Sequence, residues 1–186
     1  MAPQLSETEK IRFYIGTQSL KQANNQVHLV EFDEENSTLK TAVYYHPQGE
    51  IWKLNSSPLN SSLIASCFNT VNSENTCSVK SAVMKVPEIT DPDKIENLDI
   101  ALSLNSPSLI GDVKTTEFHS IDENKMACVS DNQLCLWEVR ESVGVCVLSI
   151  QLEGKNNPKF TTGKWNPHQN CNQVNEIPNS IEELLN

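Results

Sequence analysis

Short apolar segments alternate with short polar ones along this chain, in the pattern of β-strands. Ile11, Phe13 and Ile15 stand at every second position, as expected for a strand with one buried face. The stretch 134–139 has apolar side chains on both faces, namely Leu134, Cys135, Leu136, Trp137 and Val139, which predicts a strand covered on both sides. Helical periodicity is nearly absent, so we predict an all-β fold. The predicted strands span residues 11–17, 26–33, 39–45, 50–55, 63–69, 78–86, 113–118, 125–130, 134–139, 145–152, 159–165 and 171–174, with one more near Ile100.

Three regions interrupt or flank this pattern. Residues 1–10 are expected to be an N-terminal tail, and residues 87–111 an acidic, proline-punctuated insertion within a domain spanning residues 11–174. Residues 175–186 are expected to form a divergent C-terminal tail, in which Ser180 and Glu183 have the spacing of a capping box for one short helical turn.

Composition and charge argue against two classes of partner, nucleic acids and the membrane interior. The chain carries 14 Lys and Arg against 24 Asp and Glu, for a net charge of −10, and no basic run is present. Nucleic-acid binding is therefore not expected, since it depends on clustered cations that replace phosphate counterions. The first residues carry Glu7 and Glu9 where a secretion signal would be basic. Because no apolar run approaches the ~18 residues of a membrane span, we expect a cytoplasmic protein without direct membrane insertion.

Candidate catalytic chemistry is sparse. The six cysteines follow no C-x-x-C spacing and are expected to be reduced and buried. No nucleophile, base and orienting group stand in a recognisable arrangement, so we expect neither catalytic residues nor a cofactor or metal site. His46 precedes a predicted strand and is expected to form a hydrogen bond within its own sheet, as the histidine of a WD repeat does.

A degraded repeat runs through the predicted strands. Residues 50–58, 115–120 and 160–167 each present an extended run that ends in a small polar residue and a turn. Phe118 and Trp165 fall at equivalent places, about one propeller-blade period of roughly 40 to 45 residues apart. The repeat predicts a propeller built from four-stranded blades.

A second signature agrees with the repeat. Asp131 precedes Trp137 by six residues, with apolar Leu134 and Leu136 between them, which is the spacing of a WD repeat. The Asp is expected in the tight turn between two strands, and the Trp between adjacent sheets. Residues 32–33 and 84–85 are interpreted as the same position in two other blades. The residues assigned to structural WD-repeat positions are Asp33, Asp131, Trp137, Glu138, Trp165 and Pro167.

Arg140 is a possible contact with a partner. With Trp137 and Glu138 it resembles the W-D-x-R docking box of substrate receptors for cullin-RING ubiquitin ligases, although Glu replaces the Asp. The simpler interpretation is an ion pair at the end of a strand on a propeller rim.

Several longer stretches are more specific than a bare W-D pair. The segments IRFYIGTQSLK, GEIWKLNSSP, SDNQLCLWEVRES and KFTTGKWNPHQNC resemble the N-terminal half of the EARP and GARP complex-interacting proteins, a family of WD-repeat propellers. The resemblance implies an incomplete propeller of about three to four partial blades, because the family continues through further repeats after Val174. It also implies a non-enzymatic adaptor of the EARP and GARP tethering complexes, peripheral to endosomes and the trans-Golgi network, in endosomal recycling and retrograde vesicle traffic.

Two alternatives stay open at this point. The chain could instead be a ubiquitin-ligase substrate receptor that uses Arg140, or an inert truncated fragment. For an adaptor, the candidate contacts are residues 18–26, the acidic insertion and Arg140, since propellers bind partners through the loops at their strand ends.

Overall fold

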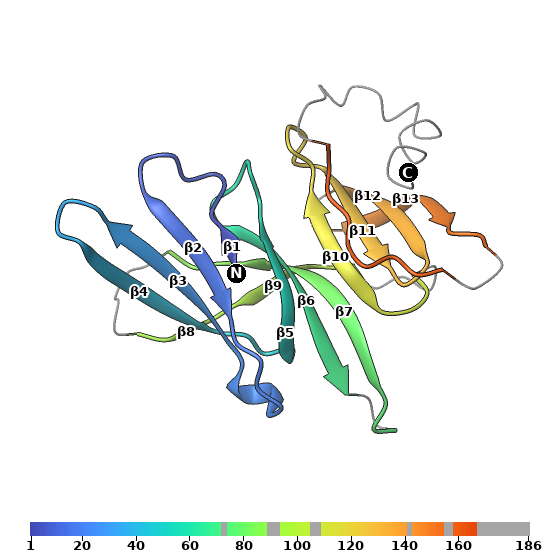
Figure 1. Cartoon of the computed structure of the whole chain (residues 1–186), viewed down its shortest axis with the longest axis horizontal. Helices are drawn as coiled ribbons and strands as arrows, with labels where there is room; N and C mark the ends of the chain where they lie inside the picture. The colour runs from blue at the N-terminus through green and yellow to red at the C-terminus, as the bar shows by residue number, and fades with distance from the viewer. Residues whose placement is uncertain (72–73, 89–93, 105–108, 141–142, 155–157, 167–186) are drawn as a thin grey trace.

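The computed structural model describes residues 1–71, 74–88, 94–104, 109–140, 143–154 and 158–166. Within these ranges the chain forms thirteen strands and one 3-10 turn, η1 (Gln22–Asn24), and the strands make three separate sheets (Figure 1). The all-β prediction is therefore confirmed.

Each sheet is assembled from strands that follow one another along the chain. Sheet 1 contains β1 (Ala2–Pro3), β2 (Ile11–Gly16), β3 (Gln26–Asp33), β4 (Thr38–Tyr45) and β8 (Glu96–Asn97). Sheet 2 contains β5 (Glu50–Ser56), β6 (Leu63–Val71), β7 (Cys77–Lys85) and β9 (Asp99–Ser103). Sheet 3 contains β10 (Val113–Phe118), β11 (Lys125–Ser130), β12 (Gln133–Arg140) and β13 (Val143–Gln151). Neighbouring strands are antiparallel except β4 and β8, which are parallel.

Sheet 2 lies between the other two sheets and is buried on both faces. Along β6 and β7 successive side chains alternate between the two neighbours, because side chains of a strand point to opposite faces in turn. Ile64, Phe68 and Met84 belong to the core shared with sheet 1. Ala65 and Cys67 belong to the core shared with sheet 3. Continuous burial over residues 64–68 explains why β6 is apolar at consecutive positions.

Each of the two cores is filled from both sides. Sheet 1 contributes Ala2, Tyr14, Val27, Leu29, Ala42 and Tyr44 to the first core. Sheet 3 contributes Val113, Met126, Cys128, Cys135 and Trp137 to the second. Trp137, which is only 3% exposed, therefore packs between two adjacent sheets. Both faces of β12 carry buried side chains, since Leu136 on the opposite face is buried as well.

The N-terminal segment does not behave as a tail. Ala2 and Pro3 pair with β2, and Ala2 is buried in the first core. The Gln4 amide Nε2 donates to the Tyr14 hydroxyl and to the Ser61 carbonyl, at 3.0 Å each. These long-range contacts bind residues 2–5 to sheets 1 and 2, and the local sequence pattern does not reveal them.

The acidic segment 87–111 is more than an inserted loop. Its described part supplies β8 and β9, and Leu98, Leu102 and Leu104 are buried in the two cores. The strand expected near Ile100 is confirmed as β9, which completes sheet 2 as its outermost strand.

The strand expected at residues 159–165 is wrong. This stretch joins no sheet, although the Phe160 amide donates to the Asp131 carbonyl at 2.6 Å and Lys53 Nζ donates to Thr162 Oγ1 at 2.8 Å. It therefore lies beside sheets 2 and 3, near β5 and the β11–β12 turn, without pairing with any strand. Residues 171–174, the tail 175–186 and Pro167 lie outside the described residues.

The alternating strand directions place the connections at two edges of the molecule (Figure 1). We name as the loop edge the connections 17–25, 46–49, 109–112 and 131–132. His46 N donates to Asn25 O, which joins connections 17–25 and 46–49, and Asp112 N donates to Asp131 Oδ2, which joins connections 109–112 and 131–132. The opposite edge holds the β3–β4 turn, residues 119–124 and the end of β12.

Burial of Met84 on the sheet 1 side of sheet 2 predicts its contribution to stability. Met84→Ala is expected to lower the free energy of unfolding by about 2 to 5 kcal/mol, because it leaves a cavity in the first core. Ile121→Ala, at a side chain that is 57% exposed, is the control and should change it by less than ~0.5 kcal/mol. Urea denaturation followed by circular dichroism measures both, and equal effects would contradict the core assignment.

Candidate interaction surface

The loop between β2 and β3 presents an apolar side chain on a rigid frame. Asn25 is fully buried, and its Oδ1 accepts the Ser19 amide at 2.7 Å while its Nδ2 donates to the carbonyls of Ser19 and Gln22 at 2.9 and 3.2 Å. These bonds hold residues 19–24 in place, and Leu20 within them is 92% exposed. A large apolar side chain held out in this way is a suitable anchor for a protein partner.

His46 connects sheets 1 and 2 beneath this loop. Its Nε2 lies 2.9 Å from Ser66 Oγ on β6, its ring meets Phe68 edge-on at 5.4 Å, and its backbone amide donates to Asn25 O at 2.8 Å. The expected hydrogen bond to the sheet whose first strand His46 precedes is thus formed, because Ser66 lies on β6 of sheet 2. Burial lowers the pKa of His46 to about 4, so the imidazole is neutral at physiological pH.

Asp131 organises the loop edge of sheet 3. It lies in the β11–β12 turn, where its carboxylate pairs with Lys114 at 2.8 Å and Lys159 at 3.3 Å and accepts the Asp112 amide at 3.4 Å. The hydrogen bond from Lys114 is the main cause of the lowered pKa of Asp131. Gly111 adopts a φ of +83°, and a Cβ at this position would stand 3.0 Å from the Asp131 side chain. Only glycine fits this approach without strain.

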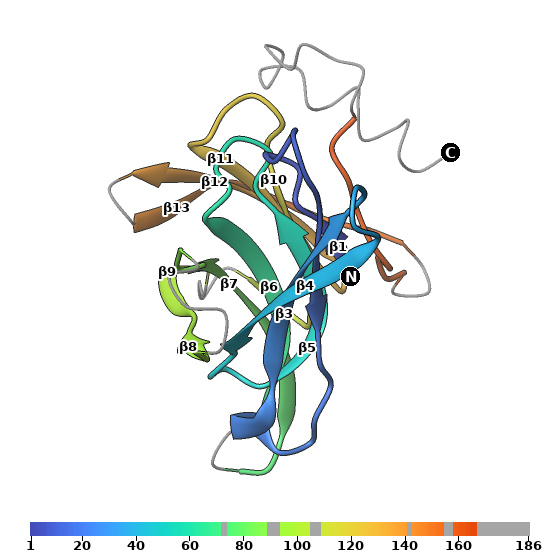
Figure 2. The same cartoon turned by 90° about the vertical axis from the view of Figure 1, so that its left-hand side faces the viewer.

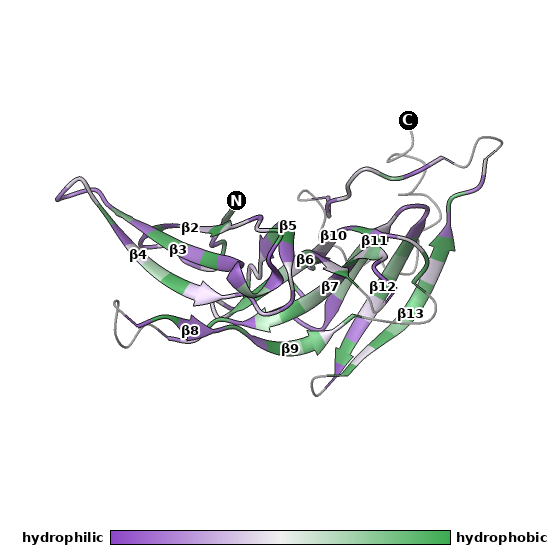
Figure 3. Ribbon diagram, turned by 90° about the horizontal axis from the view of Figure 1, so that it is seen from below, coloured by the Kyte–Doolittle hydropathy of each residue, from purple (hydrophilic) through white to green (hydrophobic). Residues whose placement is uncertain are grey.

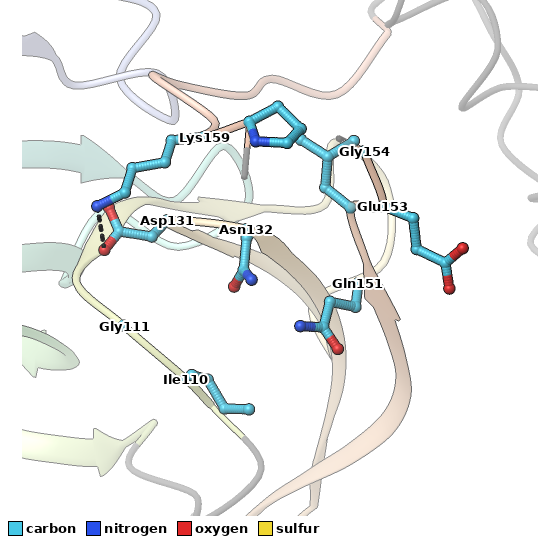
Figure 4. A pocket seen from close by; sticks show the side chains of 10 residues that line it. Ile110, Gly111, Asp131, Asn132, Gln151, Glu153, Gly154 and Lys159 are labelled. Atoms are coloured by element: carbon cyan, nitrogen blue, oxygen red, sulfur yellow. Dashed lines mark ion pairs between the residues drawn. The ribbon is translucent and has the colours of Figure 1, made fainter. Parts of the chain in front are cut away.

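An open depression of about 540 Å³ lies beside the Asp131 turn. Figure 4 shows Asn132, Gln151 and Glu153 around it, with the Lys159–Asp131 ion pair at one side. Polar side chains line its wall together with three apolar ones, those of Ile110, Leu152 and Pro158. Because it is open and its lining mixes polar and apolar side chains, it suits a loop or peptide of a partner protein better than an enclosed apolar ligand.

Arg140 and Asp33 lie at the opposite edge. The exposed Arg140 guanidinium pairs with Glu138, which agrees with the simpler interpretation of a strand-end ion pair. Asp33 accepts the Asn36 side-chain and backbone amides, each at 3.1 Å, and these bonds with Lys40 lower its pKa to about 2. The structure therefore does not bring residues 18–26 and Arg140 together.

Trp165 packs against the turn that follows β10. Its ring meets the buried His119 edge-on at 4.7 Å, and its Nε1 donates to the Glu117 carbonyl at 3.3 Å. The contact fixes the end of segment 158–166 against sheet 3.

The described residues hold no group of three His, Cys, Asp or Glu side chains placed to bind a metal ion. Burial raises the pKa of the thiols of Cys67, Cys128 and Cys135 to about 11, 12 and 11, so they are protonated at neutral pH. Cys77 is exposed, which corrects the expectation that the cysteines are buried, and Cys171 lies outside the described residues. In the part of the chain that the structure describes, no helix is long and apolar enough to cross a membrane.

Sequence reasoning missed the buried Asn25 and the two lysines at Asp131. One signal was present, since Gly111–Asp112 stands before the inner strand of sheet 3, where WD repeats carry a Gly-His pair. Asn25 offered no comparable signal, because it is one of 20 asparagines in the chain.

The fold and its loop edge define an all-β protein of meandering, stacked sheets that offers surfaces for other molecules. No protein-family model matches the chain. Over 94% of its length it is homologous to the EARP and GARP complex-interacting proteins, which confirms the resemblance drawn from its segments. It is 36% identical to the EARP-interacting protein homolog of Gekko japonicus and 35% identical to EARP and GARP complex-interacting protein 1 of Homo sapiens. A more distant relative, WD repeat-containing protein DWA2 of Arabidopsis thaliana, is 26% identical over 97% of the chain. The chain spans about half the length of these relatives, 48% in each case.

The environment of His46 predicts a pH dependence of stability. Because the folded-state pKa of about 4 lies below the ordinary 6.5, the unfolded chain binds the proton first as the pH falls. His46 should therefore cost the folded state progressively more stability between pH 6.5 and 4, up to about 3 kcal/mol. His119 acts in the same direction, since burial lowers its pKa too.

Urea unfolding of wild type and His46→Gln at pH 7.5, 6.5, 5.5 and 4.5 isolates this contribution. The difference in unfolding free energy between the two proteins should shift in favour of the variant as the pH falls. A difference that stays constant across the range would contradict a neutral, buried His46.

Proposed function

We propose that this protein is a non-enzymatic adaptor that binds the EARP and GARP complexes through its loop edge. The observation that carries the proposal is homology over 94% of the chain to proteins whose names state that they interact with these complexes. Because the chain matches only half of their length, the partner assignment comes from the relatives, and the loop edge is our own assignment.

The arrangement of the sheets supports a WD-repeat propeller as the scaffold. Each sheet has a third strand, β3, β7 or β12, that carries Phe32–Asp33, Met84–Lys85 or Trp137–Glu138 near its end. We take each sheet as one blade, with β8 added at the edge of the first. The His46–Ser66 bond then has the place of the histidine contact of a WD repeat. The proposal is an incomplete propeller of three blades.

The loop edge is the better contact surface for a physical reason. It carries an exposed leucine on a rigid loop of sheet 1 and, on sheet 3, a depression of mixed polar and apolar lining beside Asp131, and protein interfaces use both apolar anchors and polar groups. The net charge of −10 suits a partner with a basic surface, because complementary charge speeds encounter. Arg140 at the opposite edge is paired with Glu138 and offers a single exposed cation.

The cellular role follows from the relatives' partners and forms part of the proposal. An adaptor of these tethering complexes acts in the cytoplasm, peripheral to endosomes and the trans-Golgi network, and supports endosomal recycling and retrograde traffic. Neither a cofactor nor a nucleic acid enters this role. The ubiquitin-ligase alternative remains a hypothesis that depends on recognition of Arg140.

Binding to purified complexes tests the proposal directly. The immobilised full chain should retain purified human EARP or GARP complex above the level of a bead control. Leu20→Asp should weaken this binding at least about tenfold, because it places a charge at the centre of the proposed contact. Biolayer interferometry gives the dissociation constants.

Arg140→Ala is the matched control at the opposite edge. It should leave the dissociation constant within about twofold of wild type. No binding by the wild-type chain would refute the adaptor role for this chain. A large loss with Arg140→Ala and none with Leu20→Asp would move the contact to the opposite edge.

A further inference from the structure

The outer face of sheet 1 is apolar and uncovered by any described element. The strand registers place on it the residues Ile11, Phe13, Ile15, His28, Val30, Phe32, Leu39, Thr41 and Val43, none of them an Asp, Glu, Lys or Arg. Leu39 is 67% exposed and Ile11 41% exposed. Figure 2 views the molecule from this side, with β3 and β4 toward the viewer.

The outer face of sheet 3 is also partly open. Segment 158–166 covers its inner half, where a Cβ on Gly163 would stand 2.9 Å from Val129. On β13, Val143 and Val145 pair with Arg140 and Glu138 and point away from sheet 2, and they are 61% and 50% exposed. Figure 3 shows that hydrophobic positions continue into β13, at the end of the row of sheets.

These two open faces correspond to faces that already pack within the molecule. The outer face of sheet 3 is equivalent to the face of sheet 2 that meets sheet 3, and the outer face of sheet 1 is equivalent to the face of sheet 2 that meets sheet 1. The contact between sheets 1 and 2 and the contact between sheets 2 and 3 therefore join the same two kinds of face. One face of each kind stays open, on sheet 1 at one end of the stack and on sheet 3 at the other.

We propose that a second copy of this chain covers both faces. The outer face of sheet 1 in one copy packs on the outer face of sheet 3 in the other, and a two-fold axis repeats the contact. The resulting dimer is a closed ring of six sheets, within the four to eight blades of propellers. This inference rests on the proposed identity of each sheet as a blade.

Three observations favour a second copy as the occupant. The sheet 1 face is apolar and the β13 part of the sheet 3 face exposes Val143 and Val145 beside the Glu138–Arg140 ion pair, so one symmetric contact buries both kinds of exposed apolar surface at once. The sheet 1 face carries no charged side chain that would be desolvated, and its Phe32 and Leu39 match the apolar surface of β13. The contact is of the kind that the molecule already makes twice, between sheets 1 and 2 and between sheets 2 and 3.

The first test is the molar mass in solution, by sedimentation equilibrium of the full chain. The chain has a mass of 20.8 kDa, and the proposal requires twice this value at micromolar concentration. Phe32→Glu and Val145→Glu, one on each face, should each weaken dimerisation at least tenfold. Leu20→Glu, at the loop edge, is the control and should remain dimeric. A wild-type monomer at 100 µM, as an order of magnitude for weak homodimers, would overturn the proposal.

Cross-linking removes the ambiguity of a variant that fails to fold. Leu39 and Val145 both lie on the fourth strand of their sheet near the opposite edge, so face-to-face stacking brings them near each other. In a Cys77→Ser, Cys146→Ser, Cys171→Ser background, which removes the exposed Cys77 and the half-buried Cys146, Leu39→Cys and Val145→Cys are made as separate proteins. A bismaleimide should join the two proteins when they are mixed and should join neither to itself. Cross-links of either protein to itself would overturn the closed ring.

The outcome is distinguishable from that of the proposed function. A monomer that retains EARP or GARP complex overturns the dimer alone. A dimer that retains neither complex overturns the adaptor role alone.

Discussion

The packing of sheet 2 on both of its faces is the interaction on which the rest of the structure depends. Residues 64–68 are buried without a break, because alternate side chains enter one core or the other. Sheets 1 and 3 touch sheet 2 through these side chains and hold their positions relative to each other through it. Loss of either core would separate a marginal group of strands from the molecule, since isolated small sheets are barely stable in water.

The same packing creates the surfaces that partners can reach. Stacking the sheets in one orientation gathers the connections after β2, β4 and β11 at the loop edge, where polar groups fix them. Asn25 binds the loop that carries Leu20, His46 joins that loop to sheet 2, and Asp131 binds the turn of sheet 3. Because the exposed side chains stand on a rigid frame, little conformational entropy is lost when a partner binds.

Much of the fold was predictable from the sequence. The continuous apolar run near Trp137 correctly indicated a strand with two buried faces, because such a run reflects burial directly. Alternation at Ile11–Ile15 correctly indicated a strand, but its three alternating apolar side chains lie on the open face of sheet 1 and Tyr14 on the other face is the buried one. The pairing of Ala2 with Tyr14 could not be predicted, since a two-residue strand has no periodicity and depends on long-range contacts.

At residues 159–165 the sequence predicted a strand that the structure does not form. This segment has the composition of a strand, but a strand also needs an adjacent partner, and none pairs with it among the described residues. For the candidate surface, sequence reasoning indicated the loop at residues 18–26, and it placed Asp131 in the turn between two strands as a structural residue. It could not show that Arg140 lies at the other edge, because that follows from the direction of β12 in three dimensions.

Native-state hydrogen exchange tests the central role of sheet 2 most directly. If both of its faces hold the molecule together, the backbone amides of β6 and β7 exchange only through global unfolding and are the most protected in the chain. Amides of β3 and β13, whose sheets each have an open face, should exchange faster through local opening. Greater protection in β3 or β13 than in β6 and β7 would contradict the account.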